Sequence, residues 1–169
     1  HAAKAPRRWR PLNSHVRHHR TSAVTMPTAD EYIIRRFVPE DAGPFLAAVR
    51  ASLPQLAHWM PWCKADYSLE DAVAWITFTE AAWSGRTEFP LGIFDRNSGS
   101  VVGGTGINQI NRVHSIGNIG YWVSTPHTGR GVAKYAAKQA ALMGFGELGL
   151  TRLEIVALTS NLASNVLLR

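Results

Sequence analysis

The sequence has little cysteine and no long apolar run. Cys63 is the one cysteine in 169 residues, which excludes an internal disulfide and a cysteine-based metal cluster. We expect Cys63 to be a small buried hydrophobic residue, with a reactive thiol as the alternative. No apolar stretch approaches the ~18 residues of a membrane span, and none follows the basic start as in a secretory signal. These absences predict a soluble, cytoplasmic protein without a metal.

Acidic residues are missing from the first 25 positions. This segment holds six of the 18 Lys and Arg residues, so its charge equals the formal net charge of +6 of the whole chain. The other 144 residues carry 12 basic and 12 acidic side chains. The excess charge therefore belongs to one end of the chain, and residues 26–169 have no basic field that would attract nucleic acid.

Residues 1–25 are predicted to be disordered, because they contain two prolines, clustered histidines and almost no apolar periodicity. They are a basic arm for nucleic acid, an organelle transit peptide, or sequence foreign to the mature protein. We favour the third, since the chain begins with His1 and Met26 directly precedes a plausible domain start. Residues 26–169 form the predicted domain, and 46% hydrophobic residues suffice for its core.

The pattern from Tyr32 onward predicts a mixed α/β fold, with a mostly antiparallel sheet and flanking helices. Short strands linked by turns indicate an antiparallel meander, and a last strand reached through a helix should lie parallel to residues 120–123. Gly103, Gly104 and Gly106 in one strand predict a bulge or close packing by a neighbour. The expected strands are 32–37, 88–95, 101–109, 115–123 and 152–158, and the expected helices begin at 39, 68 and 131.

The segment Leu56–Trp62 is too aromatic for an ordinary solvated loop. It is either a satellite hydrophobic cluster or one wall of an acceptor pocket.

Residues 120–133 read as a strand, a proline-marked loop and the glycine-rich start of a helix. The first turn of a helix leaves its amides unpaired and carries a partial positive charge, so it can hold a phosphate. A tight turn that feeds a surface helix is the alternative. Two diverging parallel strands would open a slot at the carboxyl end of Val123, with phosphates at Gly129–Gly131.

Three segments together resemble the GNAT superfamily of N-acetyltransferases, in its RimJ/RimL branch of ribosomal-protein N-terminal acetyltransferases. They are Gly120–Val123, Pro126–Ala133 and Asn161–Asn165, and the resemblance covers about Ile33 to Arg169. It implies a GNAT-type acyl-CoA N-acyltransferase fold and acetyl-CoA as the acetyl donor.

The resemblance also implies roles for individual residues. In the family, a Gln/Arg-x-x-Gly-x-Gly/Ala pattern grips the pyrophosphate through backbone amides. Thr128 takes the first position here, where the family has a long polar side chain. The implied cofactor-binding residues are Tyr121, Trp122 and Val123 beside the pantetheine arm, Thr128, Gly129, Arg130, Gly131, Val132 and Ala133 at the pyrophosphate, and Asn161 on the pantetheine.

Attack of an amine on a thioester needs donors for the developing oxyanion and a proton source for the departing thiolate. The backbone N–H of Val123 is a candidate donor, and Ser164, which the resemblance places near the thiol, is a candidate proton source. The alternative for Ser164 is a helix N-cap. Trp59, Trp62 and Asn118 are the expected substrate-binding residues.

The base is the missing part of this scheme. Asn118 stands where an acid is expected before Ile-Gly-Tyr-Trp, and an amide cannot take the proton. His127 and His114 titrate in a suitable range, but each can equally be a solvated or capping residue. The family places an acidic base further along than Arg169. Because the chain stops within an apolar helix start, we expect a C-terminal truncation that removes the terminal hairpin.

The sequence therefore predicts an N-acetyltransferase that acts on a primary amine, the N-terminal α-amine of a ribosomal or other protein, by direct attack in a ternary complex. A small-molecule N-acetyltransferase for amino acids, antibiotics or polyamines is one alternative. A non-catalytic acyl-CoA-binding module is another. A dinucleotide-binding fold with Glu154 as its acid fits less well, and no Gly-Lys-Ser/Thr supports a phosphate loop of the Walker type.

Overall fold

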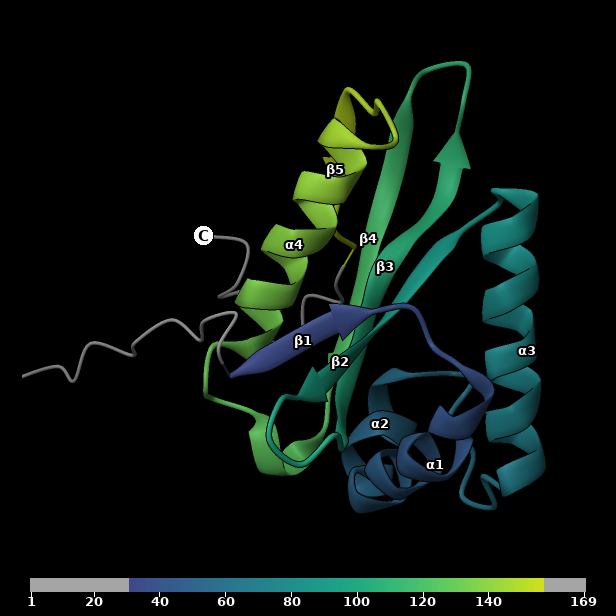
Figure 1. The fold of residues 1–169 in the computed structure, drawn as a ribbon, viewed down its shortest axis with the longest axis vertical. Coiled ribbons are helices and arrows are strands. Elements are labelled where there is room, and N and C mark those ends of the chain that lie inside the picture. The colour runs from purple at the N-terminus through teal and green to yellow at the C-terminus, as the bar shows by residue number, and fades with distance from the viewer. Residues whose placement is uncertain (1–30, 157–169) are drawn as a thin grey trace, which may run out of the picture.

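The computed structural model describes residues 31–156, which form one five-stranded sheet with helices on both faces (Figure 1). The strands are β1 (Tyr32–Arg35), β2 (Phe89–Asp95), β3 (Val101–Asn111), β4 (Ile116–Val123) and β5 (Arg152–Glu154). The helices are α1 (Ala42–Ala51), α2 (Leu53–Trp59), α3 (Leu69–Gly85) and α4 (Val132–Gly146), with 3-10 turns η1 (Pro39–Asp41) and η2 (Thr125–His127). The predicted mixed α/β class is confirmed.

The sheet has the order β1-β2-β3-β4-β5. Strands β1 to β4 pair antiparallel and β5 pairs parallel to β4, as the turn spacing and the helical crossover predicted. The expected register of the last pair was wrong: β5 lies beside Ile116–Asn118 instead of residues 120–123. The parallel partner therefore ends early, and the carboxyl half of β4 has no strand on that side among residues 31–156. A mostly antiparallel order also does not match a dinucleotide-binding sheet, in which neighbouring strands run parallel.

Two layers of helices cover the sheet. Helix α4 packs on one face against β3 and β4, and α1 and α3 pack on the other face (Figure 1). Because side chains of a strand alternate between faces, Ile107 and Ile119 reach the α4 side, where they join Met143 in a hydrophobic cluster. Phe45 and Ile76 form the cluster on the α1–α3 side. None of the helices within residues 31–156 is long and apolar enough to cross a bilayer.

The first predicted helix is two helices. Helix α1 ends at Ala51, Ser52 caps it, and Leu53 begins α2, a helix that the sequence reading did not anticipate. Pro54 lies in the first turn of α2, where its missing N–H has no intrahelical partner to lose. The hydroxyl Oγ of buried Ser52 accepts a hydrogen bond of 2.8 Å from the backbone N–H of Thr125. The break between the two helices thus holds the loop that follows β4.

Helix α3 begins where the sequence predicted, with Ser68 as its N-cap. The Ser68 side chain accepts from the Asp71 N–H at 3.2 Å, and the Asp71 carboxylate accepts from the Ser68 N–H at 2.8 Å. These bonds, from the Ser68 backbone first and its hydroxyl second, lower the pKa of Asp71. Just before this helix, Cys63 is 5% exposed and burial raises the pKa of its thiol, which favours the structural reading over a reactive one.

Candidate active site

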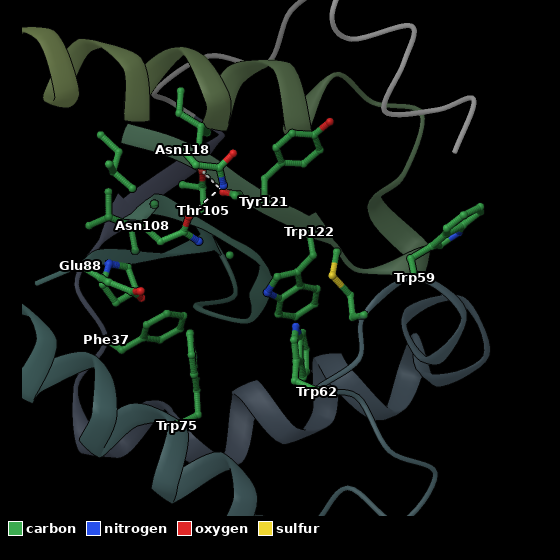
Figure 2. A pocket seen from close by; sticks show the side chains of 18 of the residues that line it. Phe37, Trp59, Trp62, Trp75, Glu88, Thr105, Asn108, Asn118, Tyr121 and Trp122 are labelled. Carbon is green, nitrogen blue, oxygen red and sulfur yellow. Dashed lines mark hydrogen bonds between the residues drawn. The ribbon is translucent and has the colours of Figure 1, made fainter. Parts of the chain in front are cut away.

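A cavity of about 690 Å³ lies between the sheet and the α1–α3 layer (Figure 2). Strands β2, β3 and β4 form its floor, and side chains from α1, α2, α3 and the segments next to them form its walls. Its volume falls within the range of about 300–1,000 Å³ typical of small-molecule sites.

The cavity exists because small residues align across three strands. The register places Pro90, Gly106 and Gly120 in one row on the same face. A Cβ on Gly106 would lie 2.5 Å from the Phe89 carbonyl oxygen, and its φ of +154° also disfavours a side chain. Close packing, and not a bulge, therefore explains this glycine, because the register shifts lie elsewhere, at Ile93/Phe94 and Asn108/Asn111.

Aromatic rings form the walls of the cavity. Trp122 meets Phe45 and Trp62 edge to face, with ring centroids 5.6 Å and 6.1 Å apart. Trp62 also contacts Tyr67. Trp59 lies at the rim, where it packs against His58 at 4.3 Å and turns away from the centre (Figure 2). Of the two tryptophans predicted to contact the substrate, Trp62 thus reaches into the cavity and Trp59 borders it.

Polar groups gather at one end of the cavity. Asn118 Nδ2 donates to Asn108 Oδ1 across the β3–β4 pair at 2.8 Å (Figure 2). Asn118 Oδ1 is buried and has no hydrogen-bond partner within residues 31–156, and neither has Trp75 Nε1 on the opposite wall. Buried polar atoms almost always have a partner, so this acceptor and this donor are available to a polar group or to water in the cavity.

The start of α4 has the geometry of an anion site. Gly129 and Gly131 have φ values of +74° and +77°, and Gly131 is the N-cap. The first intrahelical bond runs from Tyr135 N–H to the Gly131 carbonyl, so the three preceding amides of the helix lack an intrahelical acceptor. A Cβ on Gly129 would meet no atom within 4 Å, and exposed Arg130 adds a positive charge. An unobstructed row of N–H groups fits a pyrophosphate.

The other residues predicted to bind the pyrophosphate differ in what they can offer a ligand. Thr128 Oγ1 donates to the Thr125 carbonyl at 2.9 Å and closes η2, so its side chain does not point to a ligand. Val132 is buried in the core and Ala133 is half-buried, so both have only their backbone amides to offer. Asn161 and Ser164 lie outside the described residues.

Side-chain hydrogen bonds fix the loop before α4, and of the side chains involved the sequence analysis named only His127, as a candidate base. Buried Ser124 bonds through Oγ to Nδ1 of His127 at 2.8 Å. Thr125 Oγ1 donates to Gln55 of α2 at 2.8 Å. Burial first, and then nearby Arg130, lower the pKa of His127. His127 therefore supports the loop and does not line the cavity; neither does His114, which lies exposed in the β3–β4 turn.

The free edge of β4 joins the helix start to the cavity. Ser124 N–H donates to Val102 of β3, while the Ser115 carbonyl accepts from the β5 side. Since backbone groups alternate along a strand, the N–H of Val123 points to the same side as Ser115, away from β3. The N–H of Val123 is thus unpaired by any strand within residues 31–156, and its part as an oxyanion donor stays a prediction.

Comparison with known proteins gives the family. A family model described as an acetyltransferase (GNAT) domain matches residues 32–169. The chain belongs to this GNAT acetyltransferase family. Within the described residues there is no cluster of three or more potential metal-ligating His, Cys, Asp or Glu side chains.

One curated relative and two solved structures illustrate the similarity. The chain is 31% identical over 101 residues to the uncharacterized N-acetyltransferase YoaA of Bacillus subtilis (strain 168), covering 60% of this chain and 57% of that protein. A Vibrio cholerae structure provisionally named a ribosomal-protein-serine acetyltransferase has 27% identity and a TM-score of 0.70, covering 84% of this chain and 78% of that one. RimL, a ribosomal L7/L12 alpha-N-protein acetyltransferase solved with coenzyme A, has 20% identity and a TM-score of 0.73, covering 84% and 79%. At this identity RimL supports the shared fold, and the expected GNAT-type architecture is confirmed.

Proposed function

We propose that the protein transfers the acetyl group of acetyl-CoA to a primary amine, by direct attack within a ternary complex in the cytoplasm. The observation that carries the proposal is the continuity of the glycine-rich start of α4, the unpaired edge of β4 and the aromatic cavity. Strand β4 contributes the edge and part of the cavity, and the chain runs from its end through η2 to the start of α4.

The donor half of the site rests on backbone groups. The helix start would hold the pyrophosphate of acetyl-CoA, with Gly129 and Gly131 allowing close approach. The carboxyl half of β4, from Tyr121 to Val123, would lie along the pantetheine arm. When bound, acetyl-CoA supplies an activated thioester, and the Val123 N–H would stabilise negative charge on its carbonyl oxygen.

The acceptor half rests on the cavity. An amine in the cavity would approach β4 from the face that carries Asn118 and Trp122, while the thioester lies along the strand edge. We propose the N-terminal α-amine of a protein, ribosomal or other, as the acceptor. Its ordinary pKa of about 8 makes it easier to deprotonate than a lysine amine of about 10.4. The names of the Vibrio cholerae and RimL neighbours support this choice of acceptor.

A free small-molecule amine is the second candidate acceptor, because aromatic walls enclose a cavity of about 690 Å³. A panel of amines distinguishes the two: peptides with free N-termini against amino acids, polyamines and aminoglycosides. A kcat/KM for peptides at least ten times that for any small amine supports the protein acceptor, and the reverse order supports the small molecule.

Binding without turnover is the remaining possibility, and the amide of Asn118 in place of an acid is the observation that favours it. Calorimetric titration of acetyl-CoA, paired with thiol release over the same panel, tests the enzyme against this module. The proposal expects binding and amine-dependent thiol release. Binding with no release for any amine contradicts transfer, and no binding contradicts the donor site as well.

A further inference from the structure

We infer that Ser52 and Gln55 are positioning residues, which hold the end of β4 so that the Val123 N–H meets the thioester carbonyl of bound acetyl-CoA. This inference rests on the proposed function, since it concerns the donor half of the same site. Neither side chain lines the cavity, and both act through Thr125.

The segment from Ser124 to Gly131 sets the spacing between the two points at which acetyl-CoA would be held. Val123 ends β4, and Gly131 is the N-cap of α4. A pyrophosphate at the helix start and a thioester at the strand edge belong to one ligand, so both are aligned only if this segment keeps one shape. A misplacement of about 1 Å can cost about 100-fold in rate. Contacts that fix the segment therefore bear directly on transfer.

Hydrogen bonds within the first half of this segment link its residues to one another. The His127 N–H donates to the Ser124 carbonyl at 2.9 Å, and the ring binds the Ser124 hydroxyl at 2.8 Å. The Thr128 N–H and hydroxyl both donate to the Thr125 carbonyl, at 3.3 and 2.9 Å. The Ser124 N–H ties this unit to the sheet through the Val102 carbonyl, at 2.8 Å. A second contact from outside the sheet would therefore constrain the whole unit.

Ser52 and Gln55 provide that second contact from the helices on the cavity side of the sheet. Ser52 Oγ accepts from the Thr125 N–H, and the Thr125 hydroxyl donates to Gln55 Oε1, each at 2.8 Å. Two residues span at most about 7 Å, so these bonds hold the chain close to the Val123 N–H. The end of β4 is thus fixed between the sheet and the break that separates α1 from α2.

A comparison of two buried hydroxyl groups shows why the Ser52 contact concerns the donor site. Ser52 is 0% exposed and Thr79 is 1% exposed. The Thr79 hydroxyl donates to the Ile76 carbonyl at 2.8 Å, within its own helix. The Ser52 hydroxyl instead reaches across 73 sequence positions to the segment that joins the two points of donor binding. Thr79 therefore stabilises a helix locally, whereas Ser52 sets the position of the strand end.

The test uses Ser52→Ala, with Thr79→Val as the matched control, because each removes one buried hydroxyl group. The first readout is the infrared carbonyl stretch of bound acetyl-CoA that carries ¹³C in the thioester carbonyl. A hydrogen bond to this oxygen lowers its frequency. We expect a lowered frequency in the wild type and in Thr79→Val, and a return most of the way to the value of free acetyl-CoA in Ser52→Ala. The same frequency in Ser52→Ala and the wild type overturns the inference.

The second readout compares turnover with donor binding. Ser52→Ala should lower kcat at least tenfold, while calorimetry should show a Kd for acetyl-CoA that changes less than threefold, because the amides at the start of α4 remain. Thr79→Val should leave both values unchanged. Equal losses of kcat in the two variants assign Ser52 a merely structural role and overturn the inference, as does a changed Kd with an unchanged kcat.

Gln55 keeps the test independent of how well Ser52→Ala folds, since this side chain is exposed. Gln55→Ala should lower kcat about threefold and shift the carbonyl frequency towards that of free acetyl-CoA. Gln55→Glu should restore both, because a carboxylate oxygen still accepts from the Thr125 hydroxyl. Equal values for the two Gln55 variants overturn the inference.

These readouts separate the inference from the proposed function. A carbonyl shift that depends on Ser52, in a wild type that transfers to no amine, contradicts the enzyme and keeps the positioning role. Transfer by the wild type, with a carbonyl shift and a kcat that Ser52→Ala leaves unchanged, keeps the enzyme and overturns the inference. A bound carbonyl that absorbs like free acetyl-CoA in the wild type overturns the inference and the part proposed for Val123.

Discussion

The indole of Trp122 lies directly over Gly104 of the neighbouring strand. A Cβ on Gly104 would lie 2.7 Å from Trp122 Nε1, closer than real side-chain contacts allow. The two residues are register partners, so the glycine makes room for a ring that lines the cavity. The shape of the site therefore depends on a missing side chain.

Gly104→Ala should displace Trp122 and destabilise the fold by about 1–3 kcal/mol, the usual cost of overpacking. Gly120→Ala is the control, because a Cβ there meets only Asn108 Nδ2, at 3.4 Å. Urea unfolding followed by tryptophan fluorescence measures both. Equal midpoints for the two variants would contradict the packing described for Trp122.

Gly129→Ala should weaken acetyl-CoA binding at least tenfold, because a methyl group at the start of α4 blocks close approach of the phosphates. Its matched control is Gly149→Ala. Both glycines have positive φ, +74° and +65°, and at neither would a Cβ meet an atom within 4 Å. Each substitution should therefore cost about 1–2 kcal/mol of stability. Calorimetry should show that the Kd changes only for Gly129→Ala, and the same change in both variants contradicts the anion site.

The stability of the protein should fall as the pH drops below about 6.5, the ordinary pKa of histidine. Burial, and then Arg130, hold the pKa of His127 below that value in the folded state. The unfolded chain then binds this proton more readily, so the stabilising contribution is present above the unfolded pKa and is lost as the pH falls through the folded pKa. Melting temperatures from pH 8 to pH 5 should decline less for His127→Asn than for the wild type. Parallel curves would show that His127 is not the group responsible.

Asp41→Asn should destabilise the fold by about 1–3 kcal/mol, since it removes charge-assisted hydrogen bonds. The Asp41 carboxylate accepts from Arg35 at 2.7 and 2.9 Å and from the Val38 N–H at 2.9 Å, and its side chain is 8% exposed. Glu154→Gln removes the Arg152–Glu154 pair, in which both partners are exposed, and should change stability by less than about 1 kcal/mol. Denaturation midpoints check both values, and similar losses would contradict the importance of burial.

Much of the fold could be predicted from the sequence because its signals are local. The capping box at Ser68 marks the start of α3, and turn residues separate β2, β3 and β4. Helix α2 was missed, because Pro54 and the aromatic residues after it resemble a loop when read alone. What makes this segment helical is tertiary: Ser52 and Gln55 bind Thr125, some 70 positions away.

The candidate site also has one part that could be predicted from the sequence and one part that could not. The glycines at the start of α4 form a local motif, so their positive φ values could be anticipated. The polar pair of Asn108 and Asn118 could not, because it depends on the register of two strands. A shift of one residue in that register would move a side chain to the opposite face. The glycines at 103–106 were the available signal, and they indicated close packing without showing that a cavity follows from it.

The most direct test of the account is to follow the acetyl group itself. The protein is incubated with acetyl-CoA labelled in the acetyl carbon and with a peptide that has one free α-amine and one lysine, and the product is mapped by mass spectrometry. We predict label on the α-amine, with one coenzyme A thiol released for each amide formed. Thiol release without labelled peptide, or bound acetyl-CoA that stays intact with every amine offered, would contradict the account.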